Sequence, residues 1–87
     1  NTLNDDVVWA IYKDKENILW IGTYKGGVNR YNITKNTFSY INNSSANKII
    51  SSRHIRAIEE DTYGNLWIGT YDGGLNIINK KTYKSVV

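Results

Sequence analysis

The sequence contains no cysteine, no proline and no methionine among its 87 residues. Without cysteine the chain can form neither a disulfide nor a thiolate-ligated zinc or iron–sulfur site. No apolar run approaches the ~18 residues that a membrane-spanning helix needs. The opening residues, NTLNDDVV, lack the basic and apolar stretches of a signal peptide, and no initiator methionine precedes them. We therefore expect a piece of a longer protein that does not itself insert into a membrane.

A large excess of charge of one sign is also missing. Eleven Lys and Arg against eight Asp and Glu leave a formal net charge of +3. The basic residues are interleaved with acidic and polar ones, so the chain lacks the basic stripe that nucleic-acid-binding domains present to phosphates. We expect no nucleic-acid partner. The sequence is instead rich in aromatic residues, with three Trp and seven Tyr, and this composition favours strands over helices.

The most informative feature is a phrase that occurs twice: LWIGTYKGGVNRYN at 19–32 and LWIGTYDGGLNIIN at 66–79. A shift of 47 positions aligns the two copies without a gap from Leu3 to Asn32, and the alignment continues if the second copy drops two residues. A catalytic constellation is rarely duplicated in this way, whereas a structural unit often is. We therefore expect two copies of one unit, at residues 1–45 and 46–87.

Each copy contains four segments with the aromatic and β-branched composition of strands. They are VVWAIYKD, ILWIGTY, GVNRYN and TFSYI in the first copy, and HIRAIEED, NLWIGTY, GLNIIN and TYKSVV in the second. Two glycines separate the second and third segments of each copy and predict a tight turn there. These glycines are Gly26, Gly27, Gly73 and Gly74. The sequence therefore predicts two four-stranded antiparallel meanders.

An aspartate opens the first turn of each copy, Asp14 in one and Asp61 in the other. Paired carboxylates can be catalysts, but their identical place in two copies indicates turn caps. Gly64 supplies a residue for positive φ in the second turn, and Asn17 stands at the equivalent place in the first. Because asparagine tolerates the left-handed region better than most residues, we expect one shared turn shape.

Large apolar residues lie on both faces of the predicted strands. In LWIGT, Leu66 and Ile68 point to one side of the sheet and Trp67 to the other. A sheet that is apolar on both faces must be covered on both, and small sheets stacked between copies of themselves are β-propeller blades. We therefore expect an all-β fold of two four-stranded antiparallel β-propeller blades. Two blades cannot close a ring, so they form either a fragment of a larger propeller or a building block of an oligomeric ring.

The motif from Ile50 to Leu75, I-x4-I-x-A-I-x2-D-x2-G-N-L-W-I-G-T-x2-G-G-L, resembles the two-component regulator propeller repeat. The pattern recurs in the first copy, where Asn17 and Ile18 replace its Gly-Asn pair. The resemblance implies the extracytoplasmic, periplasmic or cell-surface sensor region of a membrane-bound bacterial hybrid histidine kinase. It also implies that further blades of a parent chain, or other copies of this chain, complete the ring.

The resemblance implies a non-catalytic sensor that recognises an extracellular oligo- or polysaccharide and regulates a linked histidine kinase. A protein-interaction scaffold and a propeller lyase or hydrolase are the alternatives. An enzyme of the latter kind needs a base and usually a metal, whereas the chain has one histidine, His54, and scattered acids. The Gly-Gly turns precede strands, so they lack the helix of a phosphate-binding loop. We expect no cofactor, no metal site and no catalysis by this chain.

Candidate ligand-binding residues are predicted on the inner strands and at one rim. Trp9 and Arg56 occupy equivalent inner-strand positions, where a propeller lines its central channel, and blade packing requires neither. The rim candidates are the aromatic and charged residues of the Gly-Gly loops and those before the second inner strand: Tyr24, Lys25, Tyr71, Asp72, Arg53 and His54. Channel filling and solvated turns are the structural alternatives for these residues. Trp20 and Trp67 belong to the repeated motif, and we expect them to fill the space between blades rather than to stack on sugars.

Overall fold

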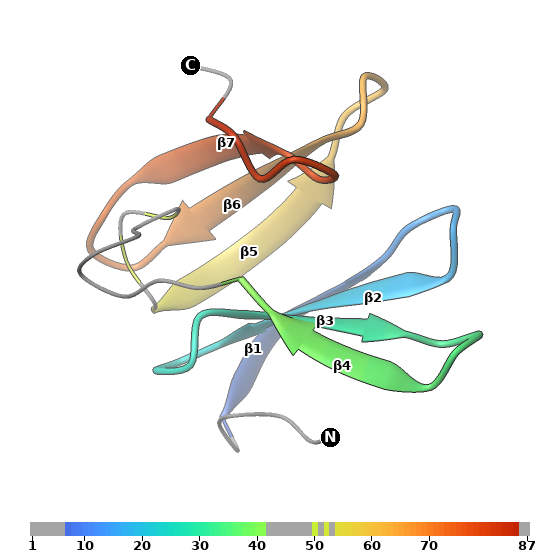
Figure 1. The fold of residues 1–87 in the computed structure, drawn as a ribbon. Helices are drawn as coiled ribbons and strands as arrows, with labels where there is room; N and C mark the ends of the chain where they lie inside the picture. Colours follow the sequence, from blue (N-terminus) through green and yellow to red (C-terminus); the bar gives the residue numbers. More distant parts are fainter. Residues whose placement is uncertain (1–6, 42–49, 51, 53, 86–87) are drawn as a thin grey trace.

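The computed structural model describes residues 7–41, 50, 52 and 54–85, which form two antiparallel sheets (Figure 1). The first sheet is a meander of β1 (Val8–Lys13), β2 (Ile18–Thr23), β3 (Val28–Asn32) and β4 (Thr37–Tyr40). The second consists of β5 (Ile55–Glu60), β6 (Asn65–Thr70) and β7 (Leu75–Asn79). The predicted all-β fold of two repeated meanders is confirmed. The described part of the chain has no helix that is long and apolar enough to span a bilayer.

The two sheets share one backbone design. Each begins with a register shift near the start of its first strand, between Val8 and Ala10 in β1 and at the equivalent place in β5. Asn17 and Gly64 have φ values of 62° and 82°, which confirms the predicted left-handed position in both first turns. The expected boundary between the units, at residues 45 and 46, lies outside the described residues.

The eighth predicted strand, at 82–87, forms only one antiparallel bridge, between Ser85 and Ile78. Residues 86–87 lie outside the described part. The backbone of Tyr83 has φ 62°, and its ring packs edge-on against Trp20 of the first sheet with the centroids 6.4 Å apart. The connection after β7 is two residues shorter than the one after β3. The chain therefore turns toward the first sheet here instead of running alongside β7.

Strand register assigns equivalent residues to equivalent faces of the two sheets. We call the face that carries Trp20 in the first sheet and Trp67 in the second the tryptophan face. We call the opposite one, with Ile11 in the first sheet and Ile58 in the second, the isoleucine face. In the first sheet the tryptophan face also carries Ala10, Tyr12, Gly22, Val28 and Arg30. In the second sheet the isoleucine face also carries Ile55, Leu66, Ile68 and Ile78.

The hydrophobic core lies where the tryptophan face of the first sheet packs on the isoleucine face of the second. Strands β1 and β2 both contact β5 across this joint, and β5 lies next to the first sheet in Figure 1. Trp20 and Val28 on one side, and Leu66 and Ile68 on the other, are almost fully buried. Each buried aliphatic side chain of this size contributes roughly 1.5–3 kcal/mol to folding. The joint is therefore the main source of stability.

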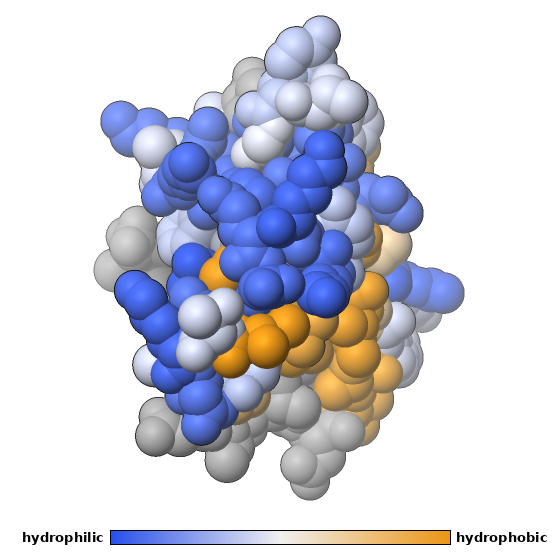
Figure 2. All heavy atoms as spheres, turned by 90° about the vertical axis from the view of Figure 1, so that its right-hand side faces the viewer, coloured by the Kyte–Doolittle hydropathy of each residue, from blue (hydrophilic) through white to orange (hydrophobic). Residues whose placement is uncertain are grey.

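The same positions are exposed where no second sheet covers them. Trp67 is 40% exposed against 1% for Trp20, and Ile11 is 64% exposed against 6% for Ile58. Figure 2 shows apolar atoms gathered on the lower half of one side of the molecule, where the first sheet lies, below a hydrophilic upper half. The tryptophan face of the second sheet is thus open around Trp67, and the isoleucine face of the first is open around Ile11, although Ile21 and Asn29 on that face are buried. These exposed apolar positions agree with the prediction that each blade packs against a neighbour on both of its faces.

Gly22 marks the closest approach of the two sheets. A Cβ on Gly22 would lie 2.9 Å from Cβ of Ile55 and would collide with its Cγ2 atom. The equivalent Gly69 lies on the open face, where a Cβ would meet only Ala57, at the ordinary contact distance of 3.8 Å. The joint therefore requires a glycine at position 22, whereas packing within the chain does not require one at position 69.

We expect Gly22→Ala to lower the free energy of unfolding by about 1–3 kcal/mol, because the added methyl overpacks the joint. Gly69→Ala is the matched control, and its effect should stay within about 0.5 kcal/mol or be slightly stabilising. Urea denaturation followed by tryptophan fluorescence measures both. Equal losses in the two variants would show that the sheets do not pack in this register.

Candidate functional site

Seven of the eight predicted ligand-binding residues come together in one continuous set of contacts at the joint. We call them the rim cluster: Trp9, Tyr24, Lys25, His54, Arg56, Tyr71 and Asp72. The eighth, Arg53, lies outside the described residues. The cluster draws on an inner strand and a Gly-Gly loop from each sheet. It therefore exists only because the two sheets pack against each other.

β-Bulges set the directions of the Trp9 and Arg56 side chains. Pairing with the neighbouring strand skips Trp9 in β1 and Arg56 in β5, so each is the extra residue at a register shift. A bulge redirects its side chain away from the regular alternation of the strand. The loops are tied to the strand starts by backbone hydrogen bonds, from Tyr24 N–H to the carbonyl of Val7 at 3.0 Å and from Tyr71 N–H to that of His54 at 2.9 Å.

The cluster presents aromatic faces and a cation side by side. The ring of Tyr24 lies between Trp9, at a centroid distance of 4.9 Å, and His54, stacked at 5.0 Å. The Arg56 guanidinium lies 5.5 Å from the centroid of the Trp9 ring and 5.7 Å from that of Tyr71. Trp9 and Arg56 line a hollow of about 290 Å³. Trp9 is 44% exposed and Tyr71 is 63% exposed, so both rings are accessible to a ligand.

A short polar network supports the cluster at His54. Nδ1 of His54 lies 3.4 Å from Oδ2 of Asp72, and the Ser52 hydroxyl donates to Oδ1 of Asp72 at 2.5 Å. Ser52 Oγ also accepts from the backbone N–H of His54 at 3.1 Å. The Ser52 hydrogen bond, together with His54, lowers the pKa of Asp72. Sequence reasoning missed Ser52; its only local signal is the side-chain turn over two residues that serine favours.

This network is not a catalytic triad. The Ser52 hydroxyl is bonded to a carboxylate and not to the imidazole, so no base activates it as a nucleophile. Within the described ranges, no group of three or more His, Cys, Asp or Glu side chains is placed to hold a metal ion. The polar groups of the cluster can orient a ligand and form hydrogen bonds with it.

The two turn aspartates make equivalent hydrogen bonds. Oδ1 of Asp61 accepts from the backbone N–H of Tyr63 and of Asn65, each at 2.9 Å, and Oδ2 accepts from the Trp67 indole at 3.0 Å. In the first sheet Asp14 accepts from Trp20 in the same way, at 2.9 Å. The Trp67 indole and the backbone donors lower the pKa of Asp61 to about 2. Each tryptophan of the motif therefore also anchors a turn, a role that sequence reasoning did not predict.

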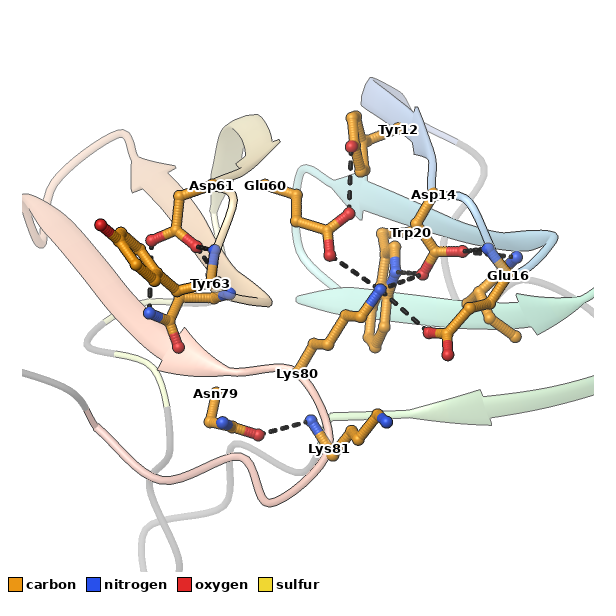
Figure 3. Close-up of polar contacts among 12 residues, drawn as sticks. Tyr12, Asp14, Glu16, Trp20, Glu60, Asp61, Tyr63, Asn79, Lys80 and Lys81 are labelled. Atoms are coloured by element: carbon orange, nitrogen blue, oxygen red, sulfur yellow. Dashed lines mark hydrogen bonds and ion pairs between the residues drawn. The ribbon is translucent and has the colours of Figure 1, made fainter.

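Lys80 joins the two sheets at these turns through ion pairs with Asp14, Glu16 and Glu60, and we call these four residues the clasp. Nζ of Lys80 lies 2.8 Å from Glu60, 3.0 Å from Glu16 and 3.2 Å from Asp14 (Figure 3). The Tyr12 hydroxyl donates to Glu60 at 3.1 Å and also crosses the joint. Burial alone would lower the pKa of Lys80, but its hydrogen bonds to the three carboxylates raise it above the ordinary value. A cavity of about 590 Å³ opens beside the clasp, lined by both aspartate turns.

The clasp is tested by Lys80→Met, which leaves three carboxylates together without a cation. We expect a loss of about 2–3 kcal/mol in the free energy of unfolding at neutral pH. The matched control is Lys81→Met, because Lys81 is exposed and its backbone N–H makes a hydrogen bond that the substitution retains. That control should stay within about 0.5 kcal/mol.

The stabilisation by the Lys80 ion pairs depends on pH through the pKa of Asp14. Desolvation raises the pKa of Asp14, but the hydrogen bonds from Trp20, the backbone and Lys80 outweigh it and lower the pKa. A carboxyl with a lowered folded pKa stabilises the protein above its unfolded value of about 3.9, and this stabilisation is lost as the pH falls through the folded value. The difference between Lys80→Met and the parent chain should therefore shrink below about pH 4. A pH-independent difference would exclude the ionic clasp.

The chain matches one family model and is similar to solved structures. The family model described as two component regulator propeller matches residues 2–25 and 49–72. The extracellular domain of BT3049 from B. thetaiotaomicron, assigned as a hybrid two component system, matches with 27% identity and a TM-score of 0.77, covering 98% of this chain and 12% of that one. The extracellular domain of BT4673 from the same organism, with the same assignment, matches with 27% identity and a TM-score of 0.74, covering 99% and 14%. The search of curated proteins gave no match.

Proposed function

This chain belongs to the two-component regulator propeller family, and we propose that it forms part of the extracytoplasmic sensor domain of a bacterial hybrid two-component system. Two observations support this proposal: both similar structures are extracellular domains of proteins with that assignment, and each is covered along only 12% or 14% of its length. The two sheets would then be neighbouring blades of a larger ring, with units at residues 1–45 and 46–87. The membrane attachment and the histidine kinase would belong to other parts of the longer protein.

The ligand that the rim cluster fits best is an oligo- or polysaccharide. The accessible rings of Trp9 and Tyr71 provide flat apolar surfaces, and the C–H faces of pyranose rings pack on such surfaces. The guanidinium of Arg56 lies against both rings and can donate to sugar hydroxyls or carboxylates. This combination of two accessible rings with a cation between them is the observation that carries the glycan proposal.

The position of the cluster suggests how binding could be transmitted. A ligand that contacts Trp9 and Arg56 touches the first strands of both sheets, β1 and β5, which contact each other across the joint. Binding would then favour one relative arrangement of the two blades and disfavour others. A ligand shifts such an equilibrium by its difference in affinity for the two arrangements. The shift would alter the activity of the linked histidine kinase, and the chain itself would perform no catalysis.

We expect the chain to bind oligosaccharides from a panel of neutral and acidic hexasaccharides, measured by isothermal titration calorimetry. Trp9→Ala and Tyr71→Ala should each weaken binding about tenfold, since one aromatic stacking contact contributes roughly 1–1.5 kcal/mol. The matched control is Tyr63→Ala, because Tyr63 is 85% exposed but lies at the aspartate turn, away from the cluster. That variant should bind as the parent chain does.

Circular dichroism of each variant shows whether the sheets remain folded. Equal losses in Tyr63→Ala and Trp9→Ala would show that the cluster is not the binding site. If no member of the panel binds and a protein partner is captured in a Trp9-dependent way, the scaffold function replaces the glycan sensor.

A further inference from the structure

Cations and aromatic rings alternate along the rim cluster. Nζ of Lys25 lies 5.9 Å from the centroid of the Tyr24 ring, and this ring packs on Trp9 at a centroid distance of 4.9 Å. The Arg56 guanidinium lies 5.5 Å from the centroid of Trp9 and 5.7 Å from that of Tyr71. A ligand that lies along this series of contacts therefore meets flat apolar surfaces and positive charges in turn, across both sheets.

The Arg56 side chain is available to a ligand. It is exposed, and in the part of the chain that the structure describes it takes part in no hydrogen bond and no ion pair. Its two ring contacts stabilise the positive charge but offer no oxygen acceptor to its N–H donors. The planar guanidinium fork matches two oxygens of one carboxylate or sulfate, so an anionic group is the partner that it binds best.

The one carboxylate of the rim cluster does not neutralise this arginine. Oδ1 of Asp72 accepts from the Ser52 hydroxyl, and Oδ2 lies 3.4 Å from Nδ1 of His54. The Ser52 hydrogen bond, together with His54, lowers the pKa of Asp72 and keeps it ionised in that network. Arg56 therefore retains a positive charge that no carboxylate of the cluster pairs with.

We propose that the ligand of the rim cluster is an acidic oligosaccharide, with the carboxylate or sulfate of one sugar bound by Arg56 and a sugar ring packed on Trp9 or Tyr71. The proposal rests on the glycan function proposed above and narrows it to anionic chains. A neutral sugar would give the guanidinium only hydroxyl acceptors, which form weaker hydrogen bonds than ionised ones. Lys25 offers a second positive charge to another sugar of the same chain. Arg56 is thus the residue that selects acidic over neutral sugars.

Matched pairs of sugars test the role of the anionic group. The probes are hexasaccharides of galacturonic, glucuronic and mannuronic acid, each beside the same chain with its carboxyl groups reduced to alcohols. In isothermal titration calorimetry, the acidic member of at least one pair should bind about tenfold more tightly than its reduced form. Sulfated forms of the reduced chains show whether the bound group is a carboxylate or a sulfate. Hexaglutamate, which has the charge without the sugar rings, should bind about tenfold more weakly than the acidic hexasaccharide.

The substitution Arg56→Gln tests the residue, because it removes the charge and keeps an amide donor. It should weaken binding of the acidic hexasaccharide about tenfold and leave binding of the reduced form unchanged. The matched control is Arg30→Gln, which removes the same charge from beside another tryptophan. The Arg30 guanidinium lies 5.7 Å from the centroid of Trp20, in a hollow that Asp14 and Lys80 of the clasp also line. This control should retain the preference for the acidic form.

The outcomes separate this inference from the glycan function itself. A preference for acidic or sulfated chains that Arg56→Gln abolishes and Arg30→Gln retains supports the inference. Reduced chains that bind as tightly as both anionic forms overturn it and leave the glycan sensor intact. Hexaglutamate that binds as tightly as the sugars also overturns it, because charge alone is then sufficient. If no sugar binds, acidic, sulfated or reduced, the glycan function fails and the inference fails with it.

Discussion

Trp20 of one sheet and the aliphatic residues of the next sheet are buried against each other, and the rest of the structure depends on this contact. Both faces of each sheet are apolar, so neither sheet is stable with both sides in water. Packing the tryptophan face of the first sheet on the isoleucine face of the second covers one face of each. Gly22 permits the close approach, and the Lys80 clasp holds the turns of the two sheets together. The two remaining faces retain the same requirement for a partner.

The joint also creates the proposed binding site. Trp9 and Arg56 come from different sheets, yet a bulge directs each of them to the same rim. Neither sheet alone could place an aromatic ring on each side of the guanidinium. A change in the packing of the blades would therefore alter the shape of the site, and occupation of the site would bias the packing. This reciprocity is what a sensor domain needs to convert binding into a change elsewhere in the protein.

The repeat made much of this structure predictable from sequence. The duplicated phrase determined the strands and turns, and the exchange of Asn17 for Gly64 identified a left-handed position correctly. Residues that differ between the copies were harder to interpret. Trp9 and Arg56 stood out because both are unusual, whereas Lys80 looked like one surface lysine among several. Its clasp depends on three acids far from it in the sequence. The composition of TYKSVV predicted a strand that includes Tyr83, and no pattern in the sequence indicated that this ring packs on Trp20 of the other sheet.

The register of the joint is the central claim, and a nuclear Overhauser measurement on methyl-labelled protein tests it most directly. The structure places the side chain of Ile55 against Gly22. It predicts strong cross-peaks from the Ile55 γ2 methyl to the α protons of Gly22. The absence of these cross-peaks, in a spectrum that still shows the strand pairing within each sheet, would contradict the account.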